Sequence, residues 1–147
     1  MRAILQRVRH AKVTVDHKIT GAIDQGLLVF LGCGEGDEEE DLEYLVDKLI
    51  HLRIFADDEG RMNRSLIDVD GQMLVVSQFT LYADTSRGRR PSFVKAMKAG
   101  PAEEMYERFV DRVRDEGVQV ETGVFGAMMD VELLNDGPVT IWLDSRE

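Results

Sequence analysis

Polar side chains continue an apolar segment near the middle of the chain, where they could act on a bound carbonyl group. Residues 74–76 read Leu-Val-Val, which is typical of a strand buried on both faces. Ser77, Gln78, Phe79 and Thr80 follow without an intervening turn residue. Buried hydroxyl and amide groups must form hydrogen bonds or serve a function. This departure from a purely apolar strand predicts a site at the strand end.

Thr80 has more than one interpretation at this point. A threonine hydroxyl is a weak nucleophile that needs an activating base, so catalysis by Thr80 alone would require a partner. Thr80 would otherwise be a strand residue that bonds to the backbone. We favour a third interpretation, in which Ser77, Gln78 and Thr80 shape and polarise a pocket. The backbone N–H groups of Phe79 and Thr80 would then face a developing oxyanion.

Histidine and cysteine offer little for catalysis or metal binding. His10, His17 and His51 lie in no motif with a serine or carboxylate, and no two have the spacing of metal ligands. Cys33 is the single cysteine, so it excludes an intramolecular disulfide and a cysteine zinc cluster. We expect it to be a buried apolar residue. The sequence therefore predicts neither a metal nor another cofactor.

Gly137-Pro138 is the second unusual feature, between the apolar stretches 131–134 and 139–143. Residue chemistry alone favours a turn between two strands. A functional interpretation requires a cis bond, whose carbonyls would offer rigid acceptors to a cationic group.

Charge is unevenly spread along the chain. The formal net charge of −10 argues against indiscriminate nucleic-acid binding, which needs a basic footprint. One stretch is nevertheless basic and has no acid among its cations, which are Arg87, Arg89, Arg90, Lys95 and Lys98. It is either a solvated loop or a contact for one segment of phosphate backbone.

Hydrophobic periodicity predicts the elements that position these residues. Strands are expected at 3–8, 12–15, 18–23, 27–31, 53–55, 74–76, 118–122, 131–134 and 139–143. A helix with Leu42, Leu45 and Leu49 on its apolar face should be capped by Asp37, with Glu40 as its capping-box partner. A second should start at Gly100-Pro101, with proline at its first position, and end at Gly117.

The predicted fold class is α+β, a mostly antiparallel sheet or partial barrel with two main helices packed on it. Parallel pairs are expected where the helices act as crossovers. Residues 1–147 should form one domain. There is no 18-residue apolar run and no signal peptide, so we expect a cytoplasmic protein that makes no membrane contact.

Long motifs in order along the whole chain resemble the D-aminoacyl-tRNA deacylases of the bacterial and eukaryotic type. The motifs are Ser77-Gln-Phe-Thr80 with Ala83-Asp84, Arg87-Gly-x-Arg-Pro-Ser-Phe93, Thr122-Gly-x-Phe125 and Asn135-Asp-Gly-Pro-Val-Thr140 with Trp142-Leu143. Supporting matches are Gln6-Arg7-Val8, Val13-Thr14-Val15, Gly26-Leu-Leu-Val, Leu31-Gly32 and Arg53-Ile54-Phe55.

The resemblance implies hydrolysis of the ester that joins a D-amino acid, or mischarged glycine, to the acceptor end of tRNA. It implies a homodimer whose site lies at the subunit interface. Gly137 and Pro138, held cis, would enter the partner's pocket and bind the substrate α-ammonium, so that an L side chain meets the pocket wall. Ser77, Gln78, Phe79 and Thr80 would line that pocket, and the 2′-OH of the terminal ribose would assist the attacking water.

Two other functions remain open at this point. A Thr80-dependent hydrolase of small esters would act on generic esters and lose all activity on Thr80→Ala. A non-catalytic dimeric tRNA-binding protein would bind without turnover and tolerate changes at Gly137. For the deacylase, we expect Arg87, Arg89 and Arg90 to contact tRNA phosphates.

Overall fold

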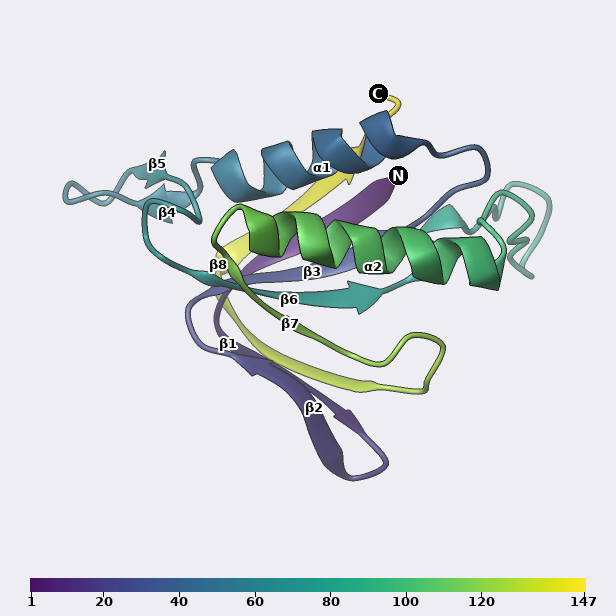
Figure 1. Cartoon of the computed structure of the whole chain (residues 1–147), viewed down its shortest axis with the longest axis horizontal. Coiled ribbons are helices and arrows are strands. Elements are labelled where there is room, and N and C mark those ends of the chain that lie inside the picture. The colour runs from purple at the N-terminus through teal and green to yellow at the C-terminus, as the bar shows by residue number, and fades with distance from the viewer.

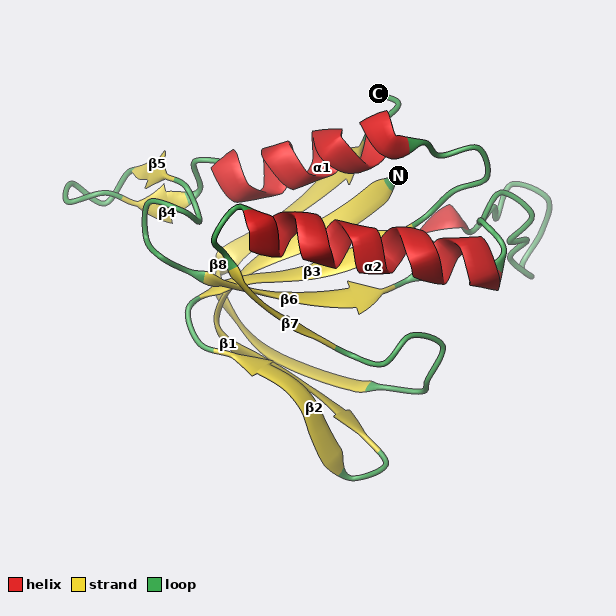
Figure 2. Cartoon of the chain, viewed as in Figure 1, coloured by secondary structure: helices red, strands yellow, loops and turns green.

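The computed structural model describes residues 1–147 and places two helices on one face of a strongly curved sheet (Figures 1 and 2). Both helices lie on the same side, and the β1–β2 hairpin projects away from them. In chain order the elements are β1 (Arg2–Val15), β2 (Lys18–Ile23), β3 (Gly26–Gly32), α1 (Glu39–His51), β4 (Phe55–Ala56), β5 (Met62–Arg64), β6 (Gln72–Ser77), a 3₁₀ turn (Phe79–Tyr82), α2 (Ala99–Asp115), β7 (Gln119–Thr122) and β8 (Asp130–Asp144).

The main sheet has the order β2-β1-β3-β6-β7, and β8 pairs with β1. β1 runs antiparallel to β2, β3 and β8, whereas β3–β6 and β6–β7 are parallel. Each parallel pair is joined by a helical crossover, α1 for the first and α2 for the second, as parallel strands require. β2 also approaches β7, where Gly21 lies against the backbone of Thr122, so the sheet is nearly closed. The predicted α+β fold is confirmed as one domain with a mixed sheet.

The core has two parts because the central strands are buried on both faces. A cluster of 26 buried residues lies between the helices and one face of the sheet, and a smaller cluster of seven lies within the curve of the other face. Leu27 and Val29 of β3 join the first cluster, and Leu28 joins the second. Cys33 is buried as predicted, and burial raises the pKa of its thiol to about 12.

The β1–β2 turn and the end of α2 agree with the sequence. Asp16 and His17 both have positive φ, which is the geometry of a tight hairpin turn. Gly117 follows α2 with φ +87, a left-handed conformation that favours glycine. The start of α2 was misplaced, because the helix begins at Ala99 and Pro101 is its third residue.

Asp37 does not cap α1, contrary to the prediction. Glu38 is the N-cap, and its capping-box partner is Asp41. Asp37 is buried one residue before the cap, where it accepts hydrogen bonds from the Met1 ammonium at 2.8 Å and the Gly34 N–H at 2.6 Å. A buried charge of the opposite sign explains this placement, which capping statistics do not consider.

Several predicted strands prove to be parts of longer ones. Residues 3–8 and 12–15 are one strand, β1, and residues 131–134 and 139–143 are one strand, β8. Both contain register shifts, which break the simple alternation from which sequence periodicity is recognised. No helix in this structure combines the length and the apolar character that crossing a bilayer would need.

Candidate functional site

The polar segment after β6 folds into a 3₁₀ turn, so Thr80 is not a strand residue. Ser77 is the last residue of β6, and the Gln78 N–H still donates to Leu31 O at 2.8 Å. The chain then turns through Phe79–Tyr82, which leaves Thr80 exposed and Phe79 57% exposed. Phe79 and Thr80, which follow a buried strand in the sequence, therefore lie on the surface.

Close packing against two glycines holds this turn at the end of β3. A Cβ on Gly32 would lie 2.9 Å from Gln78 O, and one on Gly34 would lie 2.5 Å from the Tyr82 ring. Larger side chains there would displace the turn. Phe79 and Thr80 occupy its first positions, where N–H groups have no partner within a helix. The sequence predicts these N–H groups to be oxyanion donors, and that role stays a prediction.

Thr80 and Gln78 interact directly. The Gln78 Nε2 donates to Thr80 Oγ1 at 2.5 Å. An oxygen that accepts this bond keeps its own proton available for another acceptor, so the Thr80 hydroxyl can donate to a water or a substrate oxygen. No hydrogen bond joins a histidine to Ser77 or Thr80, and His51 instead lies 3.1 Å from Asp47 on α1.

The arginine-rich loop lies next to this turn. Backbone hydrogen bonds between Asp84 and Ser92 close the loop, and the Phe79 and Phe93 rings pack edge to face at 5.0 Å. Hydrogen bonds from the Ser86 hydroxyl and N–H hold the pKa of Asp84 below its ordinary value. Three arginines are predicted to contact phosphates, namely Arg87, Arg89 and Arg90. All three are exposed and make no ion pair within the chain.

Gly137 and Pro138 lie in an exposed bulge of β8, and the bond between them is cis. Gln6 of β1 pairs with Thr140 and Val8 pairs with Asn135, so residues 136–139 have only one β1 residue opposite them. The strand continues on both sides of this bulge. The interpretation of this segment as a turn between separate strands is therefore wrong.

Two side chains hold this bulge, and both stand in motifs quoted from the sequence, where neither was given a role. Asn135 Nδ2 donates to Arg7 O at 3.1 Å and Val139 O at 2.9 Å, and its Oδ1 accepts from the Val139 N–H at 3.1 Å. The Arg7 guanidinium donates to Asp136 O at 2.8 Å and to Ile54 O. An arginine flanked by strand residues such as Gln6 and Val8 was the available signal, because a strand tolerates a half-buried cation only with partners.

One chain does not bring the two motifs together. Ser77 is level with Leu31 of β3 and hence with Ala3 of β1, whereas the β8 bulge is level with Arg7. Four residues along β1 and three strand spacings across the sheet separate them by roughly 20 Å, at ~3.3 Å per residue and ~4.8 Å per strand. A pocket that uses both motifs therefore needs another copy of one of them.

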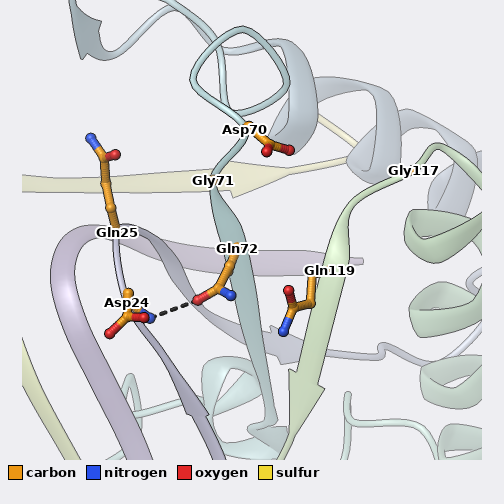
Figure 3. A pocket seen from close by; sticks show the side chains of 7 residues that line it. All are labelled: Asp24, Gln25, Asp70, Gly71, Gln72, Gly117 and Gln119. Carbon is orange, nitrogen blue, oxygen red and sulfur yellow. Dashed lines mark hydrogen bonds between the residues drawn. The ribbon is translucent and has the colours of Figure 1, made fainter.

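A polar depression of about 430 Å³ lies at the opposite ends of the strands from Ser77 (Figure 3). No hydrophobic residue lines it, and the bond drawn in this view joins the Asp24 N–H to Gln72 Oε1 at 2.7 Å. Ligand pockets are mostly apolar with a few convergent polar groups, so this open hollow is a poor candidate. No three side chains of the metal-binding types come together to hold an ion. The lining residues are Asp24, Gln25, Asp70, Gly71, Gln72, Gly117 and Gln119.

Comparison with known proteins agrees with the motifs. The family model described as D-Tyr-tRNA(Tyr) deacylase matches residues 4–144. A D-aminoacyl-tRNA deacylase from Bacillus pumilus is 58% identical over 147 residues, covering all of both chains. One from Aquifex aeolicus is 56% identical over the full length of this chain and 99% of its own.

Solved structures show the same fold. A structure described as c-Myc DNA Unwinding Element Binding Protein superposes with a TM-score of 0.93 at 39% identity, covering 98% of each chain. A probable eukaryotic D-amino acid tRNA deacylase superposes with a TM-score of 0.82 at 22% identity, covering 97% of this chain and 98% of its own.

Proposed function

This chain belongs to the D-Tyr-tRNA(Tyr) deacylase family, and from that premise we propose that it hydrolyses the ester bond of D-aminoacyl-tRNA. The products are the free D-amino acid and tRNA. The observation that carries the proposal is the pair of exposed motifs, the 3₁₀ turn with Thr80 and the clamped bulge with Gly137 and Pro138. Both are held by specific contacts, although Thr80, Gly137 and Pro138 are themselves exposed.

The two motifs meet, in this proposal, across a homodimer. The separation of roughly 20 Å within one chain supports an arrangement in which the bulge of one protomer enters the pocket of its partner. The sheet face without helices also supports it, because Ile4, Phe30 and Trp142 are neighbours there and none is buried. An apolar face of this kind is suited to contact with a second copy.

Chirality is selected by main-chain oxygens. The Gly137 and Pro138 carbonyls accept hydrogen bonds from the substrate α-ammonium and so fix the orientation of the α-carbon. An L side chain then points at the pocket wall and a D side chain points outward. Glycine has no side chain to exclude, so mischarged glycyl-tRNA is also a substrate.

Hydrolysis relies on positioning and on the substrate itself. The Phe79 and Thr80 N–H groups stabilise the oxyanion, and the Thr80 hydroxyl donates to the reacting group. The hydrogen bond from Gln78 and the lack of a bonded histidine both argue against Thr80 as a covalent nucleophile. The ribose 2′-OH activates or orients the attacking water. Ser77 lies at the base of this pocket, at the end of β6.

Contact with tRNA is confined to its acceptor end and neighbouring phosphates. Arg87, Arg89 and Arg90 are unpaired cations beside the turn on a chain of net charge −10, so they are suited to that contact. Phosphate contacts carry no sequence information, so tRNA identity should matter little.

The decisive experiment compares deacylation of D- and L-tyrosyl-tRNA by the native protein and by Gly137→Val. The added side chain would overlap the Val139 backbone and so displace the bulge. We expect rapid hydrolysis of the D ester alone, and loss of that activity in the variant. Equal rates on both enantiomers would refute chiral selection, and hydrolysis of generic small esters would favour a simple esterase.

A further inference from the structure

Arg2, at the start of β1, contacts both the 3₁₀ turn and the end of β8. Its Nε donates to Asp144 Oδ2 at 2.9 Å, and its Nη1 donates to Leu81 O at 3.0 Å. The guanidinium carbon lies 4.4 Å from the centre of the Tyr82 ring and 5.4 Å from that of Trp142. One side chain thus makes an ion pair, a hydrogen bond to the main chain and two contacts with aromatic rings.

These contacts hold the turn from β1 and β8, whereas the glycines at the end of β3 pack against it from another side. Gly32 and Gly34 set how closely the turn approaches β3, through Gln78 O and the Tyr82 ring. Arg2 holds the Leu81 carbonyl and covers Tyr82. The turn spans only four residues, so a shift at Leu81 moves Thr80 and Phe79 with it.

We propose that Arg2 is a positioning residue for the deacylation site. The inference rests on the proposed function, because it assigns the turn to the reaction. Arg2 does not touch reacting atoms, and it acts through Leu81 and Tyr82 on the placement of the Thr80 hydroxyl and the adjacent N–H groups. Arginine is required because a planar guanidinium can donate in its plane while its face lies on a ring, whereas lysine provides a single point charge.

The test uses Arg2→Met and Arg2→Lys, with Arg112→Met as a matched control. Arg112 makes a bidentate ion pair with Glu43 that joins α2 to α1, away from the turn. All three variants remove or alter an arginine that pairs with a carboxylate. Each is assayed for kcat and KM on D-tyrosyl-tRNA, and for thermal unfolding, at a temperature where all are folded.

For Arg2→Met we expect kcat to fall roughly 10-fold or more with KM within about twofold of native, because a misplaced group loses rate more than binding. Arg2→Lys should recover thermal stability through Asp144 but not kcat. Arg112→Met should lose stability and keep kcat. Native kcat in Arg2→Met, or recovery of kcat in step with stability in Arg2→Lys, would overturn the inference.

A second measurement is independent of turnover. The Leu81 N–H donates to Gln78 O and the Ala83 N–H donates to Thr80 O, and both bonds lie within the turn. Amide hydrogen exchange at these two positions should accelerate in Arg2→Met and not in Arg112→Met. Unchanged exchange would refute the positioning role. If the native protein failed to deacylate any D-aminoacyl-tRNA, the proposed function would fall, and exchange would still decide whether Arg2 holds the turn.

Discussion

Asn135→Ala tests whether the bulge of β8 must be held rigidly to select D substrates. The substitution removes three hydrogen bonds, two donated by Nδ2 to Arg7 O and Val139 O and one accepted by Oδ1 from the Val139 N–H. The Arg7 guanidinium still contacts Asp136 O, so the bulge keeps one of its two supports. The exposed pair Gly137-Pro138 lies between the lost contacts and would gain freedom.

The magnitude follows from those three bonds. A hydrogen bond contributes about 1 kcal/mol net, and Asn135 is only partly buried, so water replaces some of what is lost. We expect the free energy of unfolding to fall by about 2 kcal/mol. If the same free energy is lost from the preference for the D ester, each ~1.4 kcal/mol lowers the D-to-L rate ratio tenfold. We therefore expect this ratio to fall at least roughly 10-fold.

The assay measures deacylation of D- and L-tyrosyl-tRNA together with urea unfolding. Asn135→Asp is the graded variant, because it keeps the acceptor for the Val139 N–H and loses both donated bonds. Asn63→Ala is the control, since Asn63 lies exposed in the short strand β5 and bonds to Arg53 and Asp57. If Asn135→Ala lost the expected stability but kept the native D-to-L ratio, the clamp would not orient the selector and the reasoning would fail.

Three further outcomes are expected. Thr80→Val should lower kcat by roughly 100-fold without abolishing it, and rapid-quench labelling should find no acyl-enzyme in the native protein, because positioning and an oxyanion site remain. Replacing Arg87, Arg89 and Arg90 by alanine should raise KM. It should also reduce the slope of log affinity against log salt concentration by up to about 2, at ~0.7 for each single-strand phosphate contact. Burial alone would raise the pKa of Asp144, yet hydrogen bonds from the Arg146 N–H and Arg2 hold it below its ordinary value of 3.8. Its stabilisation is therefore present above that value and lost as pH falls through the lower folded value. The stability difference between native and Asp144→Asn should thus be constant at neutral pH and shrink as pH falls below the ordinary value.

Elements with a simple period could be predicted from the sequence. The helix 39–51 and the strand 26–32 follow from one apolar stripe and one continuous apolar run. β8 could not, because its bulge shifts the apolar alternation and a glycine-proline pair normally signals a turn. The prediction of the α1 N-cap was wrong for another reason. The buried Met1 ammonium binds Asp37, and Glu38 caps the helix instead. Long-range pairing of charges leaves no local pattern.

The candidate site divides in the same way. Ser77, Gln78 and Thr80 were recognisable because polar residues extend an apolar strand, yet the turn that exposes them depends on Gly32 and Gly34 of a distant segment. The supporting roles of the residues that hold the motifs could not be assigned from the sequence. Arg2 and Asn135 act through carbonyl groups, and no side-chain motif records which carbonyl a distant arginine will contact.

The proposed main-chain selection would also explain why this chain lacks the usual signs of a hydrolase. A backbone carbonyl keeps its chemistry whatever residue bears it, so a selector built from Gly137 and Pro138 depends on geometry alone. Geometry is in turn set by the groups behind it, the Asn135 amide and the Arg7 guanidinium. A site of this design has few residues whose side chains must react, and its specificity depends in part on residues that never touch the substrate. Substitutions in those supporting contacts should therefore impair discrimination between enantiomers more than substitutions of polar residues that line the pocket.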